Sequence, residues 1–89
     1  MAQLTRSLAI AWASDGIRVN ALAPGWIATD LTAALTQNSE RSAELVGRTP
    51  MGRWGKPDDL AGPALFLASP GANFITGVLL PLDGGYSSR

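Results

Sequence analysis

The sequence predicts half of an α/β fold of the doubly wound kind, in which parallel strands alternate with helices. Two stretches with helical apolar spacing are each followed by a short apolar strand pattern, and a polar, irregular region lies between the two pairs. The last strand pattern is a nearly continuous apolar run, which is typical of parallel strands covered on both faces. The expected order is helix, strand, short lid helices, helix, strand.

The first helix is expected over residues 1–14, where apolar residues recur at i, i+4, i+7 and i+8. Gly16 ends this helix because glycine readily takes the left-handed conformation that follows a last turn. Residues 17–23 are rich in branched apolar side chains and predict a strand, which Pro24 and Gly25 stop. No N-cap precedes the helical pattern, so we expect that earlier helical turns are missing.

The middle of the sequence is expected to be exposed and mobile between residues 29 and 49. Thr29 and Asp30 precede a short apolar pattern, as an N-cap and first helical residue do. A break at residues 37–39 is followed by a second short helix expected over residues 40–48. This region therefore predicts one or two short helices and no strand.

The final third predicts a loop, a helix and a strand. Residues 49–57 contain two prolines and two glycines, which is typical of a loop. Pro57 suits the first position of a helix that ends near residues 69–71. Pro63 lies inside that helix and is expected to bend it. Residues 78–82 are the apolar strand, and residues 83–85 turn the chain after it.

Composition limits the chemistry that the chain can perform. The 89 residues include no cysteine and no histidine, which excludes disulfides, thiolate metal sites, a cysteine nucleophile and a histidine base; we expect no metal site. Zero formal net charge with scattered basic residues argues against nucleic-acid or membrane-surface binding. No apolar run reaches the roughly 18 residues of a membrane span, so a cytoplasmic protein is expected.

A length of 89 residues predicts one partial domain, which spans residues 1–89. Two strands do not make a stable sheet, and an unpaired parallel strand leaves an aggregation-prone edge. We therefore expect a partner, which is either a further copy of the chain or a complementary N-terminal half.

Several separated motifs follow one another in a recognisable order. They are Gly16-Ile17-Arg18-Val19-Asn20-Ala21-Leu22-Ala23-Pro24-Gly25 with the following Thr29, Pro50-Met51-Gly52-Arg53-Trp54-Gly55, Phe66-Leu67-Ala68-Ser69, Thr76-Gly77 and Asp83-Gly84-Gly85-Tyr86. Together they resemble the C-terminal part of a short-chain dehydrogenase/reductase, and the resemblance spans essentially the whole chain. It implies a Rossmann-like sheet, NAD or NADP as cofactor, a small carbonyl or alcohol substrate and assembly into oligomers.

The resemblance also implies what the chain lacks. The family's glycine-rich turn and its catalytic Ser, Tyr and Lys have no counterpart, and the single tyrosine, Tyr86, does not match the catalytic position. In the family that tyrosine transfers the proton while the lysine lowers its pKa. We therefore expect no catalytic residue here, material missing on the N-terminal side, and no turnover by this chain alone.

The implied site lies after the first strand, because open α/β sheets bind ligands beyond the carboxyl ends of their strands. The cofactor-binding residues implied by the resemblance are Pro24, Gly25, Ile27, Thr29 and Leu31, and the substrate-binding residues are Trp26 and Leu35. Gly25 would leave room for the nicotinamide, while the backbone of Ile27 and the hydroxyl of Thr29 would meet its carboxamide. A helix start at residues 30–31 would lie near the pyrophosphate, since helix N–H groups attract anions. Residues 31–51, which we call the lid, would close over the substrate.

Other interpretations remain open at these positions. Pro24-Gly25 can be a plain turn, and Thr29 can be an N-cap with or without a cofactor role. The chain can also be an association module without a cofactor, or an unrelated small α/β protein. Arg53 can grip an acidic substrate, although pairing with Asp58 or Asp59 is favoured.

Four further positions have structural interpretations. Trp12 is expected in the core or an interface, and Trp54 is expected to anchor its loop. Asn20 is expected to support the loop through hydrogen bonds, and Asp83-Gly84-Gly85 is expected to be a structural turn.

Overall fold

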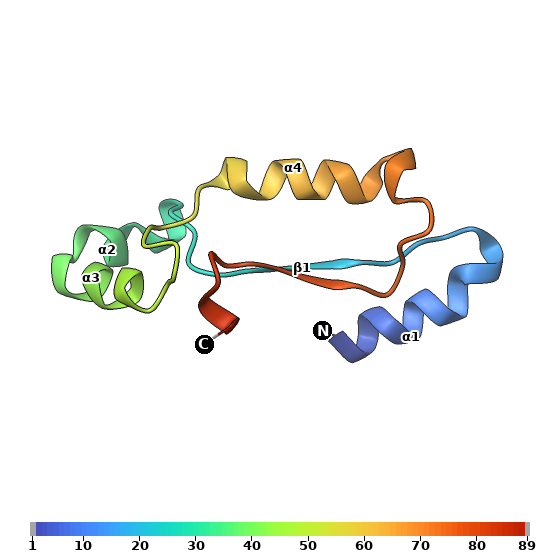
Figure 1. Cartoon of the computed structure of the whole chain (residues 1–89), viewed down its shortest axis with the longest axis horizontal. Helices are drawn as coiled ribbons and strands as arrows, with labels where there is room; N and C mark the ends of the chain where they lie inside the picture. The colour runs from blue at the N-terminus through green and yellow to red at the C-terminus, as the bar shows by residue number, and fades with distance from the viewer. Residues whose placement is uncertain (1, 89) are drawn as a thin grey trace. The chain divides into compact units, whose positions relative to one another are not determined.

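The computed structural model describes residues 2–88 and confirms the expected order of elements (Figure 1). The helices are α1 (Ala2–Trp12), α2 (Ala33–Gln37), α3 (Ser39–Gly47) and α4 (Pro57–Ala68), the strands are β1 (Ala21–Pro24) and β2 (Leu79–Leu82), and the short 3-10 helices are η1 (Ala13–Asp15), η2 (Asp30–Thr32), η3 (Pro70–Ala72) and η4 (Tyr86–Ser88). The described residues divide into two compact units, with 2–23 and 62–80 in unit 1 and 24–61 and 81–88 in unit 2.

The two strands form one parallel pair. The Ala21 N–H donates to the Val78 carbonyl at 2.9 Å, and the Gly25 N–H donates to the Leu82 carbonyl at 3.0 Å. Residue numbers therefore rise together along both strands, as they do only in a parallel arrangement. The parallel α/β class predicted from the sequence is confirmed.

The strand expected over residues 17–23 is shorter than predicted, because β1 begins at Ala21. The Val19 N–H donates to the hydroxyl of Thr76 at 3.0 Å instead of to a backbone carbonyl. One residue later, the side chain of Asn20 bonds to the backbone of the facing segment. Before Ala21 one backbone bond remains, from the Gly77 N–H to the Val19 carbonyl at 2.7 Å, and side chains replace the other ladder bonds, which shortens the regular strand.

The expectation that the last strand is covered on both faces is wrong for this chain. Along β2 exposed and half-buried residues alternate, and Leu79 keeps 37% of its surface exposed. Trp12, expected in a core or interface, is 41% exposed and so lies outside a core, and its place in an interface stays a prediction. Among the described residues the buried side chains are Thr5, Ala9, Leu45, Thr49 and Ala72. The apolar residues of β2 therefore form a strand, but few other residues of this chain pack against them.

Unit 1 contains α1, the second half of α4 and most of the strand pair. Figure 1 shows α1 and this part of α4 on opposite sides of the strands. The Arg18 guanidinium donates to the Leu67 carbonyl at 2.7 Å, which ties the segment before β1 to α4. Gly16, with a φ of 74°, follows the last turn of the first helical segment as predicted.

Unit 2 contains the helix pair α2 and α3, which lie side by side (Figure 1). Helical structure is interrupted between them at Asn38, whose side-chain oxygen accepts a hydrogen bond from the Arg41 N–H at 3.1 Å. The second helix therefore begins at Ser39, one residue earlier than expected, because Asn38 is its N-cap. Within α3, Leu45 is buried, and its carbonyl accepts from the Thr49 hydroxyl at 2.9 Å. The mobility expected here stays a prediction.

The helix α4 starts at Pro57, as predicted, and runs through Pro63 to Ala68. Asp58 and Asp59 occupy its first turn, where negative charge complements the helix dipole. The bend expected at Pro63 stays a prediction. No helix within residues 2–88, α4 included, is long and apolar enough to cross a membrane.

Candidate functional site

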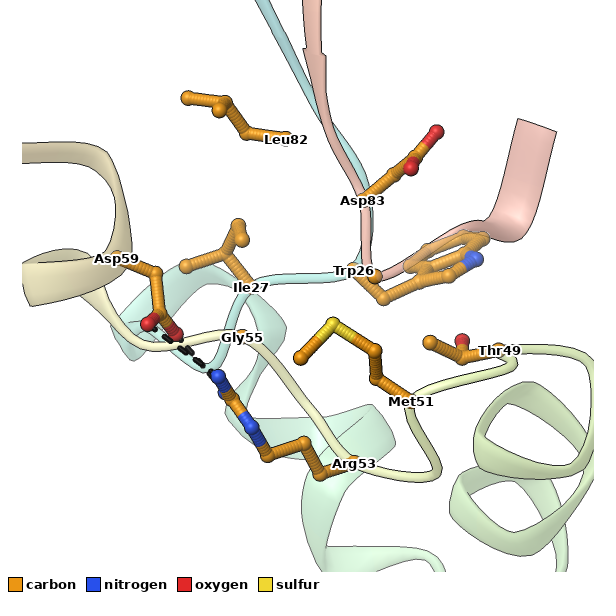
Figure 2. A pocket seen from close by; sticks show the side chains of 10 residues that line it. Trp26, Ile27, Thr49, Met51, Arg53, Gly55, Asp59, Leu82 and Asp83 are labelled. Atoms are coloured by element: carbon orange, nitrogen blue, oxygen red, sulfur yellow. Dashed lines mark hydrogen bonds and ion pairs between the residues drawn. The ribbon is translucent and has the colours of Figure 1, made fainter. Parts of the chain in front are cut away.

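A small pocket of about 60 Å³ lies in unit 2, beyond the carboxyl ends of both strands (Figure 2). It is lined by Trp26, Ile27, Thr49, Met51, Arg53, Gly55, Asp59, Leu82, Asp83 and Gly84. Figure 2 shows the Met51 thioether reaching toward the middle of this group, while the Asp83 carboxylate points away. The place agrees with the rule for open α/β sheets. The pocket by itself is much smaller than a typical ligand site of roughly 300–1,000 Å³.

The segment after β1 is held by the loop that precedes α4. Ile27 forms a parallel bridge with Gly55, in which the Gly55 N–H donates to the Trp26 carbonyl at 2.9 Å. The Ala28 N–H donates back to the Gly55 carbonyl at 2.8 Å. A Cβ on residue 55 would meet the Cδ1 atom of Ile27, so the end of that side chain would have to turn aside. The bridge extends the sheet beyond β1 and fixes Trp26 and Ile27 at the pocket.

Thr29 is the N-cap of η2, as the sequence predicts. Its N–H donates to the Thr32 hydroxyl at 2.9 Å, and that hydroxyl in turn donates to the Ile27 carbonyl at 2.7 Å. The hydroxyl of Thr29 lies on an exposed residue, 3.5 Å from the Thr32 hydroxyl. The local bonds therefore shape the loop and leave the Thr29 side chain accessible.

The expected anion site at residues 30–31 has little physical support. The helical turn that starts there is the three-residue η2, followed by the five-residue α2. Such short helices align few peptide dipoles, and the carboxylate of Asp30 opposes a phosphate. Leu31 is 97% exposed and so contacts very little of the chain.

The pocket brings together two of the seven residues that the resemblance implied. Trp26 and Ile27 line it, whereas the other five residues do not: Pro24, Gly25, Thr29, Leu31 and Leu35. Pro24 is exposed at the end of β1, and Leu35 is half-buried in α2. Thr49 and Met51 belong to the lid, residues 31–51, which was expected to border the substrate, but neither residue was singled out, and no role was predicted for Leu82. The rule that parallel strands end at one edge could have found Leu82 and its neighbour Asp83, but no local signal marks the other two.

Arg53 pairs with Asp59, so the favoured interpretation of this arginine is confirmed. The two guanidinium nitrogens lie 2.9 and 3.3 Å from the two carboxylate oxygens, and the Lys56 N–H also donates to Asp59 at 2.8 Å. The hydrogen bond from Arg53 is the main cause that lowers the Asp59 pKa to about 2, and the same bond raises the Arg53 pKa. The Arg53 guanidinium is thus paired with Asp59 of α4 and is not free to bind an acidic ligand.

Acid is expected to break this pair only below pH 4. The Asp59 pKa falls from 3.8 to about 2 on folding, so the pair stabilises the fold above pH 3.8 and this contribution is lost as the pH falls toward 2. An NMR titration of the Asp59 carboxyl carbon should give a midpoint near 2 in the wild type and a higher midpoint in Arg53→Ala, which stays below the ordinary value because the bond from the Lys56 N–H remains. An ordinary midpoint in the wild type would show that the pair does not form in solution.

Asp83 shapes the turn after β2, as predicted. Its carboxylate accepts from the Gly85 N–H at 3.0 Å and from the Ser87 N–H at 3.1 Å. Hydrogen bonding from Ser87, first through its side chain, lowers the Asp83 pKa. Gly84 and Gly85 have φ of 61° and 92°, which glycine adopts without strain. Asp83 is therefore a structural residue of the pocket wall.

Trp54 anchors the loop before α4, which confirms its expected role. Its indole Nε1–H donates to the Ser42 hydroxyl of α3 at 2.7 Å. Its ring meets Trp26 edge to face, with centroids 6.3 Å apart and planes at 75°. This arrangement is one of the favourable geometries for aromatic pairs.

A parallel strand pair with helices and a pocket beyond its carboxyl ends defines the chain as part of an open α/β fold. A family model described as enoyl-(acyl carrier protein) reductase matches residues 1–87. The chain belongs to this family of short-chain dehydrogenases/reductases, as its motifs indicated.

Similar proteins are dehydrogenases of comparable fold. The chain is 54% identical over 87 residues to 2-dehydro-3-deoxy-D-gluconate 5-dehydrogenase of Pseudoalteromonas atlantica, with 98% of the chain and 34% of the relative covered. It is 52% identical over 85 residues to galactitol 2-dehydrogenase (L-tagatose-forming) of Cereibacter sphaeroides, with 96% and 34% covered. A crystal structure of a putative NAD(P)-dependent gluconate 5-dehydrogenase from Beutenbergia cavernae with bound NADP matches with a TM-score of 0.93 and 50% identity, over 99% of this chain and 35% of that one. The chain thus spans about a third of the length of these relatives.

Proposed function

We propose that this chain supplies the nicotinamide-side loop and the substrate lid of an NAD(P)-dependent oxidoreductase acting on a carbonyl or alcohol substrate. The observation that carries the proposal is the placement of residues 24–29 at the carboxyl end of a parallel strand pair, held by the Ile27–Gly55 bridge. The agreement with an NADP-bound relative over 99% of the chain supports it.

The exposed side chains of this segment suit one end of a nicotinamide. The accessible hydroxyl of Thr29 can donate to or accept from a carboxamide, and Trp26, three residues earlier in the sequence, is 36% exposed. A bound nicotinamide supplies the centre that gives or takes hydride. In this assignment Pro24, Gly25, Ile27, Thr29 and Leu31 border the cofactor, and Trp26 and Leu35 border the substrate. The small pocket is then one wall of a larger site.

The proton transfer that accompanies hydride transfer needs an acid or base that these residues do not supply. The chain contains one tyrosine, Tyr86, and one lysine, Lys56. Tyr86 lies in η4 after the closing turn, and Lys56 lies just before α4, so neither follows the paired arrangement of the family. We therefore propose that the chain alone turns over no substrate and acts with residues that it does not contain.

Exposed apolar side chains support assembly with a partner. Large side chains with more than half of their surface exposed are Leu4, Ile10, Leu31, Met51, Leu65 and Phe74. Apolar surface of this kind in a short chain favours association. The partner is either a second copy or a complementary N-terminal half, and the same surface would serve an association module that binds no cofactor.

A chimeric enzyme tests the proposal. The 89 residues are joined to the N-terminal part of the Beutenbergia cavernae relative in place of its matching segment, and NADP reduction is followed with gluconate as the substrate probe. We expect turnover by the chimera and none by the chain alone. Within the chimera, Thr29→Val should weaken NADP binding about three- to tenfold, since it removes one hydrogen bond.

The matched control for that variant is Thr36→Val, because Thr36 uses its hydroxyl within α2 at the Ala33 carbonyl. It should leave NADP binding unchanged. A folded chimera that neither binds NADP nor turns over gluconate would favour the association module and overturn the proposed function.

A further inference from the structure

The hydrogen bond between Trp54 and Ser42 links the lid to the loop that precedes α4, both in unit 2. Ser42 belongs to α3 and thus to the lid, whereas Trp54 belongs to the loop before α4. The bond is short at 2.7 Å and partly buried, and the Trp54 indole also meets Trp26 edge to face. One side chain therefore contacts both the lid and a residue proposed to border the substrate.

The loop that carries Trp54 is itself firmly held. The Met51 N–H donates to the Gly84 carbonyl at 3.0 Å, and Gly55 forms the bridge to Ile27. Between these two points, Arg53 bonds both to Asp59 and to the carbonyl of Trp54 at 3.0 Å. Trp54 thus projects from a backbone fixed on both sides, and its indole offers α3 a fixed attachment point.

The nicotinamide-side segment does not depend on this attachment. Residues 24–29 are held by backbone bonds from Gly25 to Leu82 and from Ala28 to Gly55, in which neither Ser42 nor the Trp54 side chain takes part. Loss of the Trp54–Ser42 bond would therefore remove one contact that positions α3, while the backbone bonds that hold the cofactor side remain.

We propose that Trp54 is a positioning residue, whose bond to Ser42 sets the distance of the lid helix α3 from Trp26 and so the fit of the substrate. The proposal rests on the proposed function, because it takes Trp26 to border the substrate. In this role the Trp54 indole N–H donates a hydrogen bond to the Ser42 hydroxyl, and no proton is transferred. Its effect is expected in substrate binding and not in the chemical step.

Two measurements test the proposal. In the chimera with NADP and gluconate, Ser42→Ala should raise the KM for gluconate about three- to tenfold, with kcat and the Kd for NADP within twofold. Ser42→Thr retains the hydroxyl and should restore the KM. In the 89-residue chain, hydrogen exchange of the Trp54 indole N–H, assigned with Trp54→Phe, should be faster in Ser42→Ala than in the wild type.

The control is Ser7→Ala, the same substitution at an exposed position of α1. It should leave both KM and indole exchange unchanged. An unchanged KM in Ser42→Ala within an active chimera would overturn the positioning role alone, and so would equal indole exchange in Ser42→Ala and the wild type. A fall in kcat that matches the rise in KM would also overturn it, since it would indicate general loss of structure. An inactive parent chimera would instead overturn the proposed function, and this role with it.

Discussion

Gly25→Ala is expected to lower the free energy of unfolding by about 3 kcal/mol, because a methyl group cannot be accommodated where β1 ends. A Cβ at this position would lie 2.6 Å from the Cβ and 2.8 Å from the Cα of Asp83. The Gly25 N–H is at the same time held to the Leu82 carbonyl at 3.0 Å. Relief of the collision therefore needs a shift of backbone and not of a flexible side chain. Urea unfolding of the 89-residue chain, followed by circular dichroism, measures the change.

Gly47→Ala is the matched control in the same chain. Gly47 is the last residue of α3, and a Cβ there would have nothing within 4 Å. Alanine is the better helix former, so this variant should be more stable than the wild type by about 0.5–1 kcal/mol. Equal stability of Gly25→Ala and the wild type would contradict the close approach of β1 to the turn at Asp83.

Gly25 illustrates what a single sequence can and cannot predict. The dipeptide Pro24-Gly25 indicates the end of a strand, and β1 does end at Pro24. The resemblance implied that glycine leaves space for a ligand, whereas the structure gives this glycine a neighbour, Asp83. That neighbour is 58 positions later in the sequence, and its approach depends on the register of a parallel pair. Register is a property of two segments, so neither segment predicts it alone.

The helices and their ends were predictable because the responsible interactions are local. The helical spacing of apolar residues, the glycine after the first helix and Pro57 at the start of α4 act within one or two turns. Burial was not predictable in this way. The run of residues 78–82 indicates a strand suited to full burial, yet Leu79 remains 37% exposed, because a pattern does not say which residues will supply the cover.

The candidate site shows the same division. Trp26 and Ile27 could be placed at the end of β1 from the sequence, since they follow Pro24-Gly25 directly. Met51 reaches the pocket only because its N–H bonds to the Gly84 carbonyl, and Gly55 reaches it through the bridge to Ile27. These contacts join segments about 30 residues apart through backbone groups, which every residue except proline carries in the same form. Residue types therefore give no sign of them.

Asn20→Ala is expected to lower the free energy of unfolding by about 2–3 kcal/mol, because the side chain of Asn20 completes the sheet where the backbone does not. Its amide nitrogen donates to the Ile75 carbonyl at 3.1 Å, and its amide oxygen accepts from the Val78 N–H at 3.0 Å. Both bonds are partly buried. Truncation loses them and leaves a backbone donor and acceptor without these partners just before β2 begins.

Asn20→Asp separates the contributions that these two hydrogen bonds make to stability. A carboxylate still accepts from the Val78 N–H but cannot donate to the Ile75 carbonyl, which it repels. The N20D variant should be destabilised at pH 7 and regain stability as the pH falls, since protonation restores a donor and the folded-state pKa of the new carboxyl lies above its unfolded value. Urea unfolding at several pH values measures this, with Asn73→Ala at an exposed position as a control expected within 0.5 kcal/mol of the wild type. If N20D had the same free energy of unfolding as the wild type at pH 7, the bond to the Ile75 carbonyl would contribute nothing to stability. The bond from the Val78 N–H would then be the one through which residue 20 stabilises the start of β2.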